Sequence, residues 1–126
     1  MDENELRSVV IGLAIEVHKN LGGPGLLESV YEEALVWELR KLNLNVERQK
    51  EVPIKYKDIT IANPLKLDII VNEILIIECK AVTGYNDIYE AQLLTYLRLT
   101  GIKLGLLINF GEKIVSQGIR RVVNGL

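Results

Sequence analysis

Residues 66–80, KLDIIVNEILIIECK, form the most apolar stretch of the chain and have the composition of two buried strands joined by a short turn. Three charged residues interrupt this pattern: Asp68, Glu78 and Lys80. Side chains two residues apart in a strand share a face, so Glu78 and Lys80 point the same way and Cys79 points into the opposite face. The apolar segment therefore presents at least one acid and one cation on a common surface.

The length of the turn decides whether Asp68 joins that surface. A two-residue turn would put Asp68 and Glu78 on opposite faces, so that both faces carried an acid. A three-residue loop over 72–74 would pair Val71 with Leu75 and set Asp68 opposite Glu78. This register is predicted because it leaves one face without a polar group. That face comprises Leu65, Leu67, Ile69, Val71, Leu75, Ile77, Cys79 and Ala81. The other comprises Lys66, Asp68, Ile70, Ile76, Glu78 and Lys80.

The remaining elements follow from apolar periodicity and from turn residues. Helices are predicted over 3–20, over about 26–42 and over the segment from Asn86 or Asp87 to Gly101, with LGGPG as an inter-helix turn after the first. Strands are predicted over 46–52, over 53–61 with a turn at Lys57-Asp58, over 103–110 and near the C-terminus. The order is α-α-β-β-β-α-β with a further short strand, an α/β fold on a mixed sheet.

Composition limits the protein class. A length of 126 residues with 48% hydrophobic content suits one domain spanning 1–126. A net charge of −2 argues against a protein that holds nucleic acid tightly by charge alone. Local basic pairs such as Arg120/Arg121 could still form a patch, or could be scattered solvated residues. A single cysteine permits no internal disulfide, and no signal-peptide pattern or membrane-spanning run is visible, so we expect a soluble, cytoplasmic protein without membrane contact.

Opposed carboxylates on a sheet repel, because their Cβ atoms lie about 5 Å apart. Two interpretations of Asp68 and Glu78 remain open. A hard divalent cation such as Mg²⁺ binds through one or two carboxylates and keeps several waters, and Lys80 could then orient a metal-activated water or neutralise transition-state charge. Alternatively, the three residues form a structural ion pair on a half-solvated sheet.

Three motifs together resemble a known family. The spacing D-x9-E-x-K, between strands and preceded by helices, resembles the PD-(D/E)XK nuclease superfamily, with its restriction-endonuclease-like core. GLLESVY (25–31) resembles the signature of the GxxExxY family within that superfamily, and QLLTY (92–96) is similar to the QxxxY motif of RecB-like nucleases. The resemblance covers nearly the whole chain.

The resemblance implies metal-dependent phosphodiester hydrolysis. Asp68, Glu78 and the main-chain carbonyl of Cys79 would ligate Mg²⁺ or Mn²⁺, and Lys80 would position the attacking water or stabilise the pentacovalent phosphate. Lys66 stands where the GxxExxY group is expected to have arginine. A lysine keeps the positive charge but lacks the bidentate fork with which arginine binds phosphate.

Glu28 heads an apolar helical stripe with Tyr31, Leu35 and Leu39. If this stripe packs over the polar face of the sheet, the Glu28 carboxylate would reach Asp68 and Glu78 as a further ligand. The alternative is an acid in the first helical turn that favours the helix dipole.

Gln92 and Tyr96 lie four residues apart on one helix face. Gln92 could bond a metal-bound water or a phosphate oxygen and Tyr96 could contact nucleic acid, or both could be buried polar groups bonded to backbone. Tyr31 and Lys66 are further expected nucleic-acid contacts. For His18, a buried, hydrogen-bonded role is favoured over a metal ligand.

We therefore predict a Mg²⁺- or Mn²⁺-dependent nuclease acting on DNA, with catalytic residues Asp68, Glu78, Lys80, Glu28 and Gln92. The alternatives are a nuclease-like fold that binds nucleic acid or protein without turnover, and a structural subunit of a larger complex. A core this small has little area for reading bases, which favours a homodimer or an accessory protein partner.

Overall fold

The computed structural model describes residues 1–126. The helices are α1 (Glu3–Asn20), α2 (Glu28–Lys41), α3 (Ile88–Thr100) and the short 3₁₀ helix η1 (Val115–Gly118). The strands are β1 (Val46–Val52), β2 (Lys55–Tyr56), β3 (Ile59–Thr60), β4 (Leu65–Val71), β5 (Leu75–Lys80), β6 (Leu104–Asn109) and β7 (Ile119–Val123). None of the helices has the length and apolar character needed to cross a membrane.

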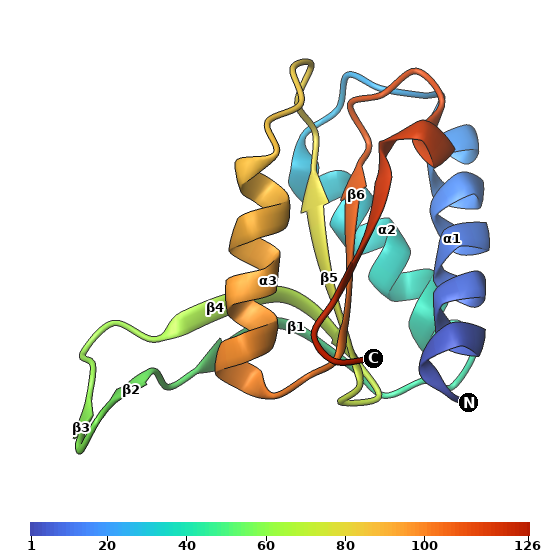
Figure 1. The fold of residues 1–126 in the computed structure, drawn as a ribbon. Coiled ribbons are helices and arrows are strands. Elements are labelled where there is room, and N and C mark those ends of the chain that lie inside the picture. Colours follow the sequence, from blue (N-terminus) through green and yellow to red (C-terminus); the bar gives the residue numbers. More distant parts are fainter.

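Five strands form one sheet in the order β1-β4-β5-β6-β7. Only β5 and β6 run parallel, and the other neighbours are antiparallel. A parallel pair needs a crossover, and α3 provides it. In Figure 1, α1 and α2 lie on one side of the sheet, α3 lies on the other, and the β2–β3 hairpin projects away from the body. The predicted α/β fold with a mixed sheet is confirmed.

The α1–α2 connection is the predicted inter-helix turn. Its Gly22, Gly23 and Gly25 have φ between 94° and 110°, a conformation open mainly to glycine. The second helix starts at Glu28, two residues later than predicted. The delay arises because the N–H of Leu26 donates to the Tyr31 hydroxyl at 3.1 Å and so remains part of the turn.

The β4–β5 hairpin has the predicted register. Val71 pairs with Leu75, so the loop contains three residues. Asn72 and Glu73 take positive φ values of 52° and 60°, which close the loop although neither is glycine. The ladder ends at the pair Ile69–Ile77, one residue before Asp68 and Glu78 would meet.

The predicted separation of faces holds for only part of β4. A large core between the sheet and α1/α2 contains Ile69, Val71, Leu75, Ile77 and Cys79, as expected. Leu65 and Leu67, predicted on the same face, instead belong to the second core under α3, with Ile70 and Ile76. The prediction was wrong for these two leucines because the alternation breaks at Asp68.

A distortion in the neighbouring strand coincides with this break. Gln49 of β1 lies between the pairs Arg48–Ile69 and Lys50–Leu67, so it faces Asp68 across the ladder. Its φ is 52°, which a regular strand does not contain. The strand pair therefore changes direction at this position.

The third helix closes tightly on the sheet. It begins after Asn86, whose side chain accepts the N–H of Ile88 at 3.0 Å, and ends at Gly101 in the left-handed conformation. A Cβ at Gly105 of β6 would lie 2.9 Å from the Leu93 side chain of α3, so glycine permits this close approach without a shift of Leu93. This packing brings α3 close to the polar residues of β5.

Candidate active site

Asp68 connects the two central strands through its side chain. Where the β4–β5 ladder ends, its Oδ2 accepts the backbone N–H of Cys79 at 3.0 Å. The carboxylate thus lies beside the strand that carries Glu78 and Lys80. The structure brings these three predicted residues to the same part of the sheet.

Glu78 is buried in an environment that opposes its ionisation. Glu78 is only 7% exposed, and its Oε1 has no hydrogen-bond partner. Burial and the neighbouring Asp68 raise its pKa to about 9, with Lys80 acting weakly in the opposite direction. An unpaired buried polar atom is costly, so this oxygen needs a proton or a cation.

A hard cation fits this pair of acids. Two carboxylates suffice for Mg²⁺, which keeps most of its waters. No group of three His, Cys, Asp or Glu side chains in the chain is arranged to enclose a metal. An ion held by Asp68 and Glu78 would therefore have to take its remaining ligands from water or the main chain.

The second helix contributes acids from its first turns, although by a different route from the predicted one. Its stripe of Tyr31, Leu35 and Leu39 packs in the apolar core, not over the polar face of the sheet, so that part of the prediction was wrong. Glu28 nevertheless lies near Asp68 and Lys80. Although the residue is exposed overall, partial burial of its carboxyl and the charge of Asp68 raise its pKa.

Glu32 is a further acid that the sequence interpretation missed. It is 4% exposed, and burial raises its pKa, with Asp68 adding to the effect. Arg48 Nε lies 3.5 Å from its Oε1. Glu32 follows Glu28 by four residues, so helical spacing alone could have placed both acids on one face.

Gln49 links the helix to the strand acid. Its Nε2 donates to Glu32 Oε1 at 2.7 Å and to Asp68 Oδ1 at 3.4 Å. The positive φ of Gln49 puts its amide between the two carboxyl groups. Such strained conformations persist where surrounding contacts enforce them and concentrate at functional sites. No sequence pattern marked this residue.

The third helix covers the other side of the site. The Lys80 ammonium lies 4.6 Å from the ring centroid of Tyr89, a cation–π contact. Burial and the charges of Glu78 and Asp68 raise the pKa of Tyr96. Gln92 is exposed on the same helix and near the Tyr96 hydroxyl. Tyr89 was missed, although it lies three residues before Gln92 on the same helical face.

The chain that leaves Lys80 is fixed by Asn109, another residue that sequence interpretation missed. Asn109 is 2% exposed, and its side-chain amide makes two hydrogen bonds to the backbone of Val82. Asn109 Oδ1 accepts the Val82 N–H, and Asn109 Nδ2 donates to the Val82 carbonyl oxygen, each at 3.0 Å. Its Oδ1 also accepts the N–H of Gly111 at 2.9 Å. The end of β6 therefore holds the segment after β5 in place.

Several predicted residues lie outside this cluster. Tyr31 is fully buried, stacks on Phe110 at 4.8 Å and donates its hydroxyl to Gly23, so the expected contact with nucleic acid requires a correction: the ring has no free surface. His18 is buried, with Nε2 3.1 Å from the Phe110 carbonyl oxygen, which agrees with the hydrogen-bonded alternative. The Cys79 thiol faces the core, and burial raises its pKa. Lys66 is exposed and makes no ion pair.

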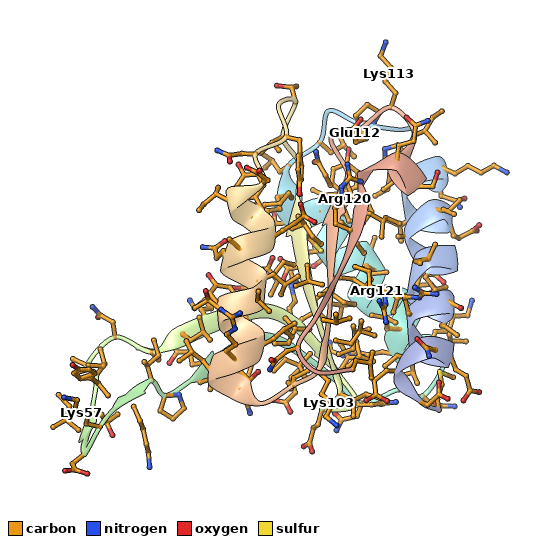
Figure 2. The ribbon with its side chains drawn as sticks, in the orientation of Figure 1. Lys57, Lys103, Glu112, Lys113, Arg120 and Arg121 are labelled. Atoms are coloured by element: carbon orange, nitrogen blue, oxygen red, sulfur yellow. The ribbon has the colours of Figure 1, made fainter.

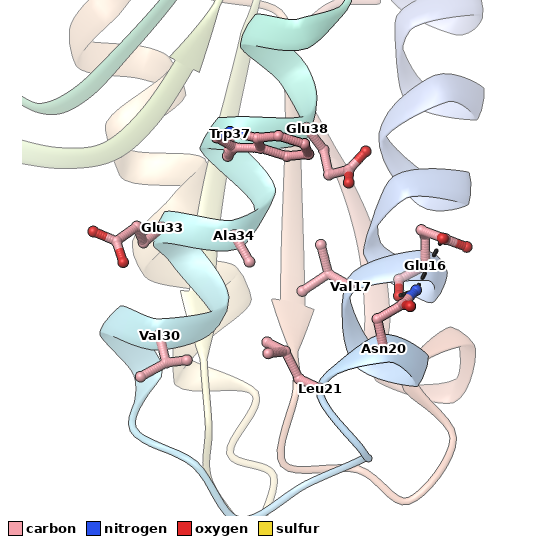
Figure 3. Close-up of a pocket in the computed structure, with 9 residues that line it drawn as sticks. All are labelled: Glu16, Val17, Asn20, Leu21, Val30, Glu33, Ala34, Trp37 and Glu38. Atoms are coloured by element: carbon pink, nitrogen blue, oxygen red, sulfur yellow. Dashed lines mark hydrogen bonds between the residues drawn. The ribbon is translucent and has the colours of Figure 1, made fainter.

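The largest hollow of the surface, about 660 Å³, lies elsewhere, between α1 and α2 (Figure 3). Its walls include Val17, Leu21 and the exposed Trp37. Neither this hollow nor the three smaller ones is lined by Asp68, Glu78 or Lys80. The acids therefore lie outside the four hollows of the surface.

A mixed α/β sheet that brings together two acids and a lysine at the end of a central strand defines a class of nuclease-like folds. Comparison with protein-family models matches residues 4–122 to the PD-(D/E)XK nuclease superfamily, and the chain belongs to this superfamily. Its members generally use divalent metals. A search of curated proteins and a search of solved structures each gave no match.

Proposed function

We propose that this chain is a Mg²⁺- or Mn²⁺-dependent nuclease that hydrolyses phosphodiester bonds of DNA. The observation that carries the proposal is the buried Glu78, which has an oxygen without a hydrogen-bond partner. Glu78 lies close to Asp68 and precedes Lys80 by two residues on the same strand. Within the superfamily, the GLLESVY and QLLTY segments support assignment to the GxxExxY group with a RecB-like helix. We further propose that residues 1–126 form one domain.

Asp68, Glu78 and the main-chain carbonyl of Cys79 would hold the ion, with Glu28 able to bond a coordinated water. A bound divalent ion supplies a water of lowered pKa and neutralises charge on the phosphate. Binding would also offset the repulsion between the acids, which favours deprotonated Glu78. The protein groups therefore provide a charge arrangement that is unfavourable without a cation.

Lys80 would act on the reacting phosphate. Its contact with Tyr89 keeps the ammonium group near the acids without a carboxylate partner. An ammonium group held there would stabilise the negative charge that develops on the phosphate oxygens. Gln92 and Tyr96 would bind the substrate from α3.

The substrate assignment follows from access and charge. In Figure 1, the N-terminal ends of α2 and α3 and the C-terminal end of β5 lie at the same end of the molecule. Helix N-termini attract anions such as phosphates. Because the net charge is −2, we expect these local features, together with a second copy or an accessory protein, to supply affinity for DNA.

A cleavage panel tests the proposal. Single-stranded DNA, double-stranded DNA, RNA and branched DNA are incubated with Mg²⁺ or Mn²⁺, and the wild type should cut DNA only when metal is present. Lys80→Ala should keep Mn²⁺ affinity, measured by calorimetric titration, and lose most of kcat, because a group that acts on the transition state changes rate more than metal binding.

Lys103→Ala is the matched control, since Lys103 is an exposed lysine elsewhere on the molecule (Figure 2). Equal cleavage by the two variants would remove Lys80 from the mechanism. Metal binding without cleavage of any strand by the wild type would instead favour a nuclease fold that binds without turnover.

A further inference from the structure

An arginine lies in register with the site, two strands away. Glu78 of β5 pairs with Leu107 of β6, and Leu107 pairs with Arg120 of β7. Residues paired in this way share a sheet face, and neighbouring strands are about 4.8 Å apart. Val122, two residues after Arg120, belongs to the core under α3, which confirms that this face is the one carrying Glu78 and Lys80.

Two tyrosines connect this arginine with Lys80. The Arg120 guanidinium lies 5.0 Å from the ring centroid of Tyr85. Tyr85 meets Tyr89 edge-on at 6.4 Å and 77°, and Tyr89 lies under Lys80. The Tyr85 hydroxyl is hydrogen-bonded to Glu90, which fixes the ring. The four side chains form a continuous row from the candidate site outward.

The outer end of this row is available to a ligand. Arg120 forms no ion pair with any carboxylate, and only its Nη1 is hydrogen-bonded, to the carbonyl oxygens of Gln117 at 2.9 Å and Ile119 at 3.3 Å. Tyr85 is 38% exposed. Nη1 thus anchors the guanidinium to the backbone, while its other N–H donors, beside an exposed ring, are left for a ligand.

We infer that Tyr85 and Arg120 form a second nucleic-acid contact, which binds an unpaired nucleotide next to the one at Lys80. Arginine presents planar N–H donors that match a phosphate, and base stacking on a tyrosine ring is favourable for any base that is not already stacked in a duplex. This inference rests on the proposed nuclease function and specifies its substrate as DNA with a single-stranded segment beside the cleaved bond.

The test measures binding without cleavage. Fluorescence anisotropy with a labelled single-stranded DNA oligonucleotide and a duplex of the same sequence is recorded in EDTA at several salt concentrations. Arg120→Ala should weaken single-strand binding at least tenfold and reduce the slope of log affinity against log salt by about one, as expected for one lost phosphate contact. Arg120→Lys should recover part of the affinity, because it retains the charge without the fork.

Arg121→Ala provides the matched control. Arg121 pairs with Leu106 of the opposite core, so it points to the other face of the same strand (Figure 2). This variant should change affinity less than twofold.

Tyr85→Ala should weaken single-strand binding more than duplex binding, whereas Tyr85→Phe should retain the single-strand affinity. Equal affinities and salt slopes for Arg120→Ala and Arg121→Ala would overturn the inference while leaving the nuclease proposal intact. A wild type that binds no single-stranded DNA in EDTA would likewise overturn the inference, whereas the nuclease proposal stands or falls with cleavage in the presence of metal.

Discussion

The charge state of Glu78 links the candidate site to stability. Its folded-state pKa of about 9 lies above its ordinary value of 4.5, so the folded protein retains a proton that the unfolded chain releases between these values. The stabilisation from this residue is complete below about pH 4.5 and is lost as the pH rises toward 9. Metal-free protein should therefore become less stable across the neutral range.

Glu78→Gln should remove this dependence. In urea denaturation with EDTA at pH 6, 7, 8 and 9, the wild-type free energy of unfolding should fall more steeply than that of the variant, by up to about 1.4 kcal/mol per pH unit. Glu51→Gln, at an exposed acid without an ion pair, should follow the wild-type slope. Parallel curves for wild type and Glu78→Gln would show that Glu78 titrates normally.

Among the elements, β6 supports the site without contributing an acid or a base to it. Its terminal Asn109 makes three hydrogen bonds that hold Val82 and Gly111. A side chain at Gly111 would lie 2.2 Å from the Val82 carbonyl oxygen, so this crossing also depends on close backbone approach. The position of the segment after Lys80 therefore depends on the end of the adjacent strand.

Asn109→Ala should lower the free energy of unfolding by about 1–3 kcal/mol, because buried backbone groups lose their partners. Cleavage should fall as well, since the segment that follows Lys80 is released. Asn20→Ala is the control: Asn20 is exposed and bonds only to Glu16, so a change within about 0.5 kcal/mol is expected. Thermal and urea unfolding of both variants measures the difference, and matching losses would contradict the anchoring role.

At the scale of the whole molecule, the β2–β3 hairpin is separate from both cores. Tyr56 and Ile59 are 54% and 59% exposed, and Lys57 lies at the far tip (Figure 2). Two-stranded hairpins of this size are marginally stable alone. The hairpin therefore contributes little to folding.

Replacing residues 55–60 by Asn-Gly should leave the free energy of unfolding within about 1 kcal/mol, because Ile54 and Ile61 are already joined by a backbone hydrogen bond that a two-residue turn can close. Mn²⁺ affinity should also be unchanged. Deleting the hairpin should be far milder than Leu97→Ala in the core under α3, which should cost about 2–5 kcal/mol. Comparable destabilisation by both changes would show that the hairpin is part of the folding unit.

The sequence by itself determined the local features of this protein. Apolar periodicity located the three helices, and the demand for one apolar face fixed the three-residue loop and the register that pairs Val71 with Leu75. These predictions succeeded because helix period, strand alternation and turn length depend on neighbouring residues. Strand spacing also put Lys80 on the same side as Glu78, whereas Glu28 was singled out mainly by its place in the GLLESVY motif, and the roles of both residues stay predictions.

Only the tertiary structure decided which surfaces meet. The positive φ of Gln49 and the break in alternation at Asp68 moved Leu65 and Leu67 to the other core, and no local pattern encodes such a distortion. Tyr31 and Glu32 are adjacent in sequence, yet one is a core ring and the other lies near the strand acids. The register across β5, β6 and β7 aligned Arg120 with Glu78. Such relations depend on packing between segments distant in the chain, because burial and charge at each residue are set by partners that sequence spacing does not reveal.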